Sequence, residues 1–94
     1  MRLSHSGLLV LKASVERSST SLYGYDLMQM TGLASGTLYP ILMRFERAGW
    51  LSSSWEKSDP REEGRPRRRL YRITGAGRAA LAGYMSVLGM EASA

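Results

Sequence analysis

The sequence predicts a mainly α-helical domain that contains one small β-hairpin. Apolar residues recur at helical spacing in three segments before position 50 and in one segment after position 74. Between them, two short stretches alternate with period two and are separated by a polar segment, which is the pattern of a hairpin. The predicted order is therefore helix, helix, helix, strand, loop, strand, helix.

The bulk composition limits the class of protein. The chain has 94 residues, 44% hydrophobic content, no cysteine and a formal net charge of +5. A chain of this length forms one domain, residues 1–94, and buries only about 60–65% of the surface that its unfolded form exposes. The absence of cysteine excludes disulfides and thiolate metal sites. Because no apolar run is long enough for a signal peptide or a membrane span, we expect a cytoplasmic protein without a membrane partner.

The first helix is expected over residues 6–17. Leu8, Leu11 and Val15 stand at i, i+3 and i+7, and two further apolar neighbours widen this stripe. A helix that is apolar over most of its surface is usually packed between other elements. We therefore expect Leu8, Leu11 and Val15 to contribute to a dimer interface.

The second helix is expected from about Leu22 to Met30, after a run of serines and a threonine that offers capping oxygens. Gly32 is placed to end it in a left-handed conformation. The backbone N–H groups at a helix start favour an anion, so Tyr23 and Gly24 are candidate phosphate contacts. Tyr25 fits either a phosphate contact or the core.

The third helix is expected from Ser35, as its N-cap, to about Ala48. Its core face is formed by apolar residues at i, i+3, i+4 and i+7, namely Leu38, Ile41, Leu42 and Phe45. The opposite face carries only small, uncharged or cationic residues: Gly36, Thr37, Tyr39, Pro40, Met43, Arg44 and Arg47. A face without acids favours close approach to a polyanion such as DNA.

The hairpin is expected to pair Leu51–Trp55 with Arg67–Ile73 around a polar wing at 56–66. Five arginines and no acid lie between positions 65 and 72. Because the guanidinium group pairs with phosphate oxygens bidentately, this cluster favours a DNA backbone contact over a merely solvated loop of mixed charge. The candidate contacts are Arg65, Arg67, Arg68 and Arg69, of which one or two could simply flank the strand.

Thr74 is expected to cap a last helix, residues 74–90. Leu81, Tyr84, Met85 and Leu88 again stand at i, i+3, i+4 and i+7, and the remaining residues are mostly Ala and Gly. Such a helix cannot cover its own apolar stripe in a monomer. We therefore predict that it forms a homodimer interface together with the first helix.

This order of elements is that of a winged helix-turn-helix with N- and C-terminal dimerisation helices, in which residues 6–73 form the DNA-binding core. Readers of this kind insert the N-terminal residues of the third helix into the major groove. Tyr39 either reaches a phosphate or packs against the second helix. The predicted groove contacts are Ser35, Gly36, Thr37, Tyr39 and Pro40, with Arg44 behind them.

No arrangement of residues predicts an enzyme, and we expect no cofactor and no metal. His5 is the only histidine, the carboxylates are scattered, and no glycine-rich nucleotide cradle is present. Trp50 and Trp55 are more consistent with ordinary packing than with a ligand pocket, and the same holds for Tyr84 and Met85.

Six short pieces of the chain match a known family in their order and spacing: Tyr23–Leu27, Gly36–Leu42, Arg47–Leu51, Gly64–Arg69, Tyr71–Thr74 and Gly77-Arg78. Together they resemble the PadR family of bacterial transcriptional regulators. The resemblance implies a homodimeric repressor of a pseudo-palindromic DNA operator, in many members released by a small-molecule effector. The segment after Thr74 is short, as in the short-tailed subgroup.

The main hypothesis is thus a sequence-specific DNA-binding transcriptional regulator whose partners are double-stranded DNA and a second copy. The alternative is a winged-helix protein-interaction module without specific DNA binding. The uncharged stretch at 79–90 favours the alternative, whereas the arginine cluster and the acid-free helix face favour the main hypothesis.

Overall fold

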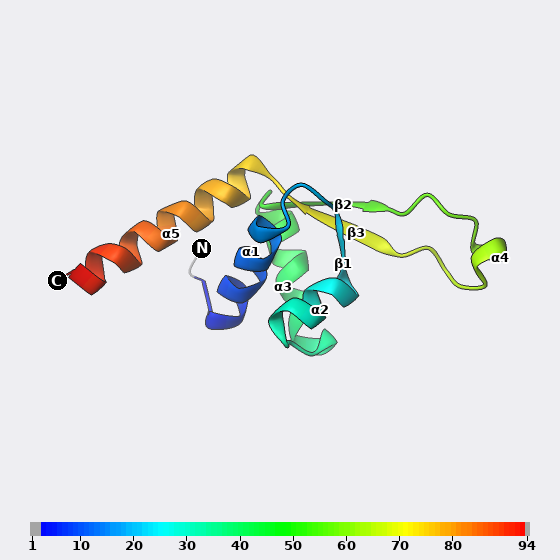
Figure 1. Ribbon diagram of the computed structural model, residues 1–94, viewed down its shortest axis with the longest axis horizontal. Helices are drawn as coiled ribbons and strands as arrows, with labels where there is room; N and C mark the ends of the chain where they lie inside the picture. Colours follow the sequence, from blue (N-terminus) through cyan, green and yellow to red (C-terminus); the bar gives the residue numbers. More distant parts are fainter. Residues whose placement is uncertain (1–2, 94) are drawn as a thin grey trace.

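The computed structural model describes residues 3–93, with side chains through position 89. The molecule is elongated, 57 × 25 × 20 Å, because a hairpin and the last helix extend from opposite sides of a helical body (Figure 1). The helices and strands, in chain order, are α1 (His5–Glu16), β1 (Leu22–Tyr23), α2 (Gly24–Thr31), α3 (Ser35–Arg47), β2 (Leu51–Trp55), α4 (Pro60–Glu63), β3 (Arg69–Ile73) and α5 (Gly75–Ser93).

The mainly helical fold with a small hairpin is confirmed, but the sheet has a third strand. The strand order is β1-β3-β2 and both pairs are antiparallel. The hairpin register places Leu51 opposite Ile73 and Trp55 opposite Arg69. Leu22 pairs with Tyr71, so the prediction that the second helix starts at Leu22 is wrong. This residue is extended and buried because it adds a strand to the free edge of β3.

The hydrophobic core lies between α1, α2, α3 and the sheet. Leu38, Ile41, Leu42 and Phe45 of α3 are all buried, as their spacing predicts. Leu11 is completely buried as well, because α2, α3, β3 and α5 all contact α1. It has no surface to offer a second subunit, contrary to the prediction. The apolar stripe on α1 therefore packs mainly into the core of the same chain.

The helix starts differ in detail from those predicted. The carboxylate of Asp26 accepts a hydrogen bond of 2.8 Å from the Tyr23 backbone N–H, so α2 is capped from within rather than by the preceding serines. Ala34 is the N-cap of α3, and Ser35 is already its first helical residue. Gly32 ends α2 with a φ of 74°, as predicted.

The wing is not a simple loop, because the short helix α4 forms at its tip (Figure 1). Asp59 caps this turn by accepting a hydrogen bond of 2.9 Å from the Arg61 N–H. The returning strand β3 starts at Arg69, two residues later than predicted. The arginines at 67 and 68 therefore belong to the wing and not to the regular sheet.

The first turn of α5 is fastened to the end of α3. Thr74 Oγ1 accepts a hydrogen bond of 3.0 Å from the Gly77 N–H and donates one of 2.6 Å to the Gly49 carbonyl. Thr74 is thus the predicted cap. Gly77 is buried, and a Cβ atom there would overlap the Trp50 carbonyl oxygen and Ile73 Cδ1. Only glycine lets α5 begin this close to the sheet.

Beyond this turn α5 leaves the body of the molecule (Figure 1). Leu81 still packs on the core, whereas Met85 is 43% exposed and Val87 is 52% exposed. Within residues 3–93, no helix has both the length and the apolar character needed to cross a bilayer.

Replacement of Gly77 by alanine should lower the free energy of unfolding by about 1–3 kcal/mol, because the new methyl group meets backbone that must shift. Gly75→Ala is the matched control in the same helical turn, since a Cβ atom there meets nothing within 4 Å. Urea denaturation of both variants measures the difference. Equal stabilities would show that the junction is not tightly packed.

Candidate nucleic-acid interface

The outer face of α3 is fully available to a partner. Glu46 is the one acid in this helix, and it lies half-buried with its carboxylate 3.8 Å from Arg69 Nη2. Because that charge is paired, the outer face presents no carboxylate. The outer face consists of Ser35, Gly36, Thr37, Tyr39, Pro40, Met43, Arg44 and Arg47, all of which are exposed.

The starts of α2 and α3 touch through a tyrosine and a glycine. Gly24 is buried, and a Cβ atom there would overlap the Oη and Cζ atoms of Tyr39. Tyr39 itself is 42% exposed, so it packs against α2 and still presents an edge outward. The Tyr39 ring therefore occupies the space next to Gly24, a candidate phosphate contact. This contact fixes how the two helices of the helix-turn-helix meet.

Tyr25 resolves an alternative that the sequence left open. It is 63% exposed and lies in the first turn of α2, so it is not a core residue. The alternative left for Tyr25 is a contact at the surface beside the start of α2.

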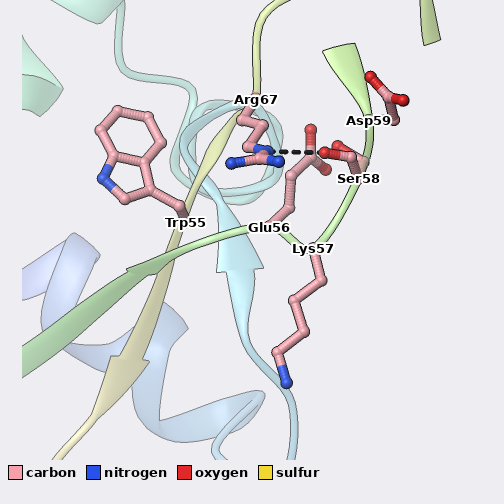
Figure 2. A pocket seen from close by; sticks show the side chains of 6 residues that line it. All are labelled: Trp55, Glu56, Lys57, Ser58, Asp59 and Arg67. Atoms are coloured by element: carbon pink, nitrogen blue, oxygen red, sulfur yellow. Dashed lines mark hydrogen bonds between the residues drawn. The ribbon is translucent and has the colours of Figure 1, made fainter. Parts of the chain in front are cut away.

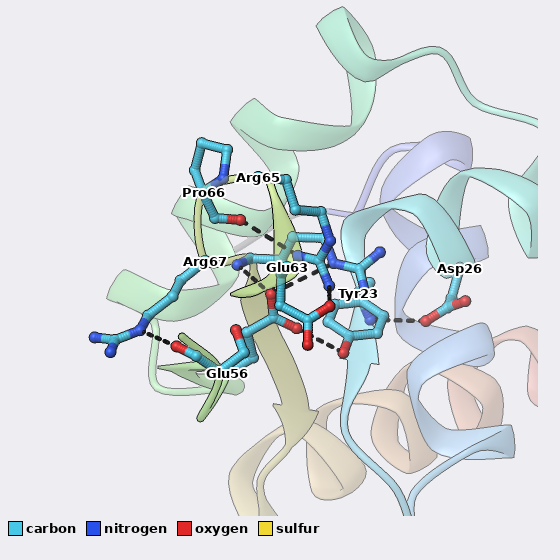
Figure 3. Close-up of polar contacts among 9 residues, drawn as sticks. Tyr23, Asp26, Glu56, Glu63, Arg65, Pro66 and Arg67 are labelled. Atoms are coloured by element: carbon cyan, nitrogen blue, oxygen red, sulfur yellow. Dashed lines mark hydrogen bonds and ion pairs between the residues drawn. The ribbon is translucent and has the colours of Figure 1, made fainter. Parts of the chain in front are cut away.

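A buried carboxylate lies where the wing joins the body of the molecule. Glu56 directly follows β2 and is only 8% exposed. It accepts hydrogen bonds from Arg65 Nη1, from the Tyr23 hydroxyl at 2.8 Å and from the Arg68 N–H at 2.9 Å (Figure 3). The Arg68 guanidinium also lies 3.9 Å from the centre of the Tyr23 ring, as in a cation–π contact. Tyr23, a candidate phosphate contact, thus has its hydroxyl and one ring face occupied.

These donors hold the Glu56 carboxyl in its charged form. The hydrogen bond from Arg65 is the largest cause that lowers its pKa, followed by those from the Arg68 N–H and the Tyr23 hydroxyl. Together they outweigh burial, which by itself would raise the pKa, and bring it from 4.5 to about 2. Glu56 was not predictable as a site residue from the sequence, because its donors come from distant positions. The only signal was an acid at the base of an arginine-rich wing.

The four predicted wing arginines divide into two groups. Arg65 and Arg69 are half-buried and held by protein groups, since Arg65 pairs with Glu56. Arg69 donates a hydrogen bond of 3.0 Å to Ser53 Oγ and lies 4.9 Å from the centre of a Trp55 ring. Arg67 and Arg68 are more exposed but also contact the protein, since Arg67 donates to the Ser58 carbonyl oxygen and Arg68 Nε lies 3.7 Å from the Glu56 carboxylate.

An open, polar hollow lies along the wing and offers no enclosed apolar site. Arg67 Nε donates a hydrogen bond of 2.6 Å to the Ser58 carbonyl oxygen across it (Figure 2). Trp55 lines its edge with 58% of its surface exposed. Trp50 packs against Phe45 instead, with ring centroids 5.2 Å apart. Among the described residues no group of His, Asp or Glu is arranged to hold a metal ion.

Comparison with known proteins identifies the family. The family model described as the transcriptional regulator PadR-like family matches residues 10–83, which is most of the chain. The chain belongs to the PadR-like family of transcriptional regulators. Members of this family are transcription regulators and not enzymes. A search of the curated proteins finds no significant match.

Solved structures show the same fold. The protein smu.1704 of Streptococcus mutans is 29% identical, with a TM-score of 0.69 over 97% of this chain and 86% of that one. A PadR-like transcription factor from Bacteroides fragilis is 25% identical, with a TM-score of 0.76 over 94% and 86%.

A third similar structure, a mutant of S. aureus MepR bound to an oligodeoxyribonucleotide, is 14% identical. Its TM-score is 0.77 over 97% of this chain and 62% of that one. These neighbours confirm the winged-helix fold.

Acid titration of stability should reveal the charged Glu56. Since its folded pKa of about 2 lies below the unfolded value of 4.5, its stabilisation is complete above pH 4.5. That stabilisation is lost as the pH falls through 2. The difference in unfolding free energy between wild type and Glu56→Gln should therefore be constant above pH 4.5 and shrink below it. Urea denaturation from pH 2 to 7 measures this, and a difference that does not change with pH would contradict the assignment.

Proposed function

We propose that this PadR-like regulator is a homodimeric repressor that binds a pseudo-palindromic DNA operator. The observation that carries the proposal is the outer face of α3, which is exposed over its whole length and carries arginines but no acid. An exposed helix face of this composition is suited to the polyanionic major groove. The formal charge of +5 per chain adds long-range attraction to DNA.

The N-terminal half of α3 would read bases. Thr37 offers a hydroxyl to a base edge and a methyl group to a thymine methyl. Arg44 lies two turns along the same side and offers a guanidinium to a guanine or a phosphate. Tyr39 keeps an exposed edge while resting on Gly24, so its hydroxyl is held in place before DNA arrives.

The wing would add contacts to the DNA backbone. Arg67 and Arg68 are exposed cations of the wing and are suited to phosphates or to the minor groove. Arg65 and Arg69 are held by Glu56, Glu46 and Ser53, so their role would be to shape the wing. The wing would therefore provide affinity and register, and α3 would provide sequence specificity.

Dimerisation would use the projecting part of α5. The stripe that starts at Leu81 against the core continues through Tyr84, Met85 and Leu88, which the described part of the chain does not fully cover. On α1, Leu8 and Val15 keep partly exposed surface and could extend this interface. Such a dimer would present two copies of α3 to successive major grooves, about 34 Å apart.

Repression would follow from occlusion of the operator by this dimer. An effector would act by changing the distance between the two copies of α3, since both must match the same DNA repeat. The dimer interface around Tyr84 and Met85 is the apolar surface on which a small molecule could act. Release by a small molecule stays a prediction.

The alternative function, a protein-interaction module, is favoured by the exposed apolar surface of α5 at Met85 and Val87. The two functions predict different results when the full chain is used to select DNA duplexes from a random-sequence library. A regulator enriches a symmetric sequence that resists competition by random DNA. An interaction module enriches nothing.

Replacement of Arg44 by alanine should weaken binding to the selected duplex by roughly tenfold to a hundredfold and relax its sequence preference, because a base or phosphate contact is lost. Arg17→Ala removes the same charge from an exposed position at the end of α1 and should change binding little. Fluorescence anisotropy with the selected duplex measures both. Equal losses would mean that only net charge matters.

Replacement of Met85 by aspartate should convert the dimer to monomer and remove binding to the selected duplex, because an unpaired charge would enter the apolar interface. The dimer dissociation constant should rise by roughly a hundredfold. Ser86→Asp adds the same charge at the next, exposed position on another side of α5. Sedimentation velocity distinguishes the two, and a dimeric Met85→Asp protein would place the interface elsewhere.

A further inference from the structure

We propose that Glu56 is a positioning residue for DNA recognition, which joins the wing to the helix-turn-helix and thereby sets where Arg68 meets the DNA. The inference rests on the proposed function, because it concerns how the same surface is organised. Glu56 itself would touch no DNA.

The contacts place Glu56 between parts of the chain that are distant in sequence. It lies at the end of β2, and its carboxylate accepts a hydrogen bond from the hydroxyl of Tyr23, which immediately precedes α2. The same carboxylate accepts hydrogen bonds from Arg65 Nη1 and from the Arg68 backbone N–H, both on the returning side of the wing (Figure 3). One side chain thus fixes the wing on both of its sides and attaches it to the body.

Tyr23 carries this link into the helix-turn-helix. Its backbone N–H is held by Asp26 and its hydroxyl by Glu56, so the residue is fixed at both ends. The next residue, Gly24, lies directly beneath Tyr39 of α3. A continuous series of contacts therefore leads from the wing through Glu56 and Tyr23 to the outer face of α3. If this series is intact, Arg68 and α3 meet the DNA in one fixed geometry.

If Glu56 acted only through its charge, its removal would have the opposite effect on specific DNA binding from the loss of a positioning residue. A carboxylate in a basic wing repels phosphates, so its removal should strengthen binding to any DNA. Positioning predicts weaker specific binding when the same charge is removed, because the Arg68 side chain loses its fixed place. Glu63 provides the comparison, since it is an acid of the same wing with 49% of its side chain exposed and only a 4.0 Å contact to Arg65.

The experiment compares Glu56→Gln with Glu63→Gln in the full chain, since each removes one negative charge from the wing. Anisotropy titrations use the selected duplex and a random duplex across a salt series. For Glu56→Gln we expect roughly tenfold to a hundredfold weaker binding to the selected duplex, with binding to the random duplex unchanged or tighter. The salt slope should fall by about one for each lost Arg68–phosphate contact. Glu63→Gln should bind both duplexes slightly more tightly.

A second variant keeps the test sharp if Glu56→Gln folds poorly, which circular dichroism would show. Tyr23→Phe removes only the hydroxyl that reaches Glu56 and keeps the ring under Arg68. It should lower specific affinity by a few fold with no loss of random-duplex binding. Amide hydrogen exchange at the Arg68 N–H, which needs no DNA, should speed up in Glu56→Gln and not in Glu63→Gln.

The possible outcomes distinguish a failure of the positioning role of Glu56 from a failure of the proposed repressor function. If the wild type selects a duplex but Glu56→Gln binds it as tightly as Glu63→Gln, the positioning role is wrong and the repressor proposal stands. A parallel loss of affinity for selected and random duplexes would also overturn the positioning role, since it would indicate general damage. A wild type that selects no duplex would overturn the proposed function, whatever the hydrogen exchange shows.

Discussion

Burial of one face of α3 determines what the rest of the molecule can do. Leu38, Ile41, Leu42 and Phe45 meet the core, and this fixes the rotation of the helix about its axis. The opposite side, from Ser35 to Arg47, must then face outward. If the helix turned about its axis by one residue position, about 100°, polar groups would enter the core. Their burial costs free energy unless they are hydrogen-bonded. The apolar spacing therefore selects the outward face as well as the inward one.

The charged groups around this helix serve two different purposes. Some arginines are paired inside the protein, as Arg65 is with Glu56 and Arg69 with Glu46. Others, such as Arg67 and Arg68, keep exposed surface. The paired cations hold the wing in shape, which a polar segment of this length could not achieve by apolar burial. Glu46 is the acid within α3, and its pairing with Arg69 leaves the outer face of the helix free of unpaired negative charge.

Prediction from the sequence succeeded where periodicity decides the structure. The spacing of four apolar residues predicted the core side of α3, and alternation predicted the bounds of β2. It failed where the partner is distant in the chain. Leu22 looked like the start of a helix because nothing local shows the free edge of β3. Leu11 was assigned to a dimer interface because spacing reveals an apolar face but not which surface covers it.

The candidate site shows the same division. Exposure of the outer-face residues of α3, such as Ser35, Thr37 and Arg44, was predictable, since the outer face is the complement of the core face. The protein contacts of Tyr23 and Gly24 were not predictable, because their neighbours Glu56 and Tyr39 lie on other parts of the chain. A count of arginines could not separate Arg65, which is half-buried against Glu56, from Arg68, which also lies beside Glu56 but is exposed. Only the fold distinguishes a cation that is half-buried against protein groups from one that keeps exposed surface for a phosphate.

Hydroxyl-radical footprinting of the wild-type chain on a duplex that it selects tests the central claim most directly. A dimer that places α3 in two successive major grooves predicts two protected segments related by two-fold symmetry, with centres about 34 Å apart. Protection by the wings should flank each segment on the DNA backbone. Uniform weak protection that random DNA removes, or no protection at all, would contradict a sequence-specific dimeric regulator.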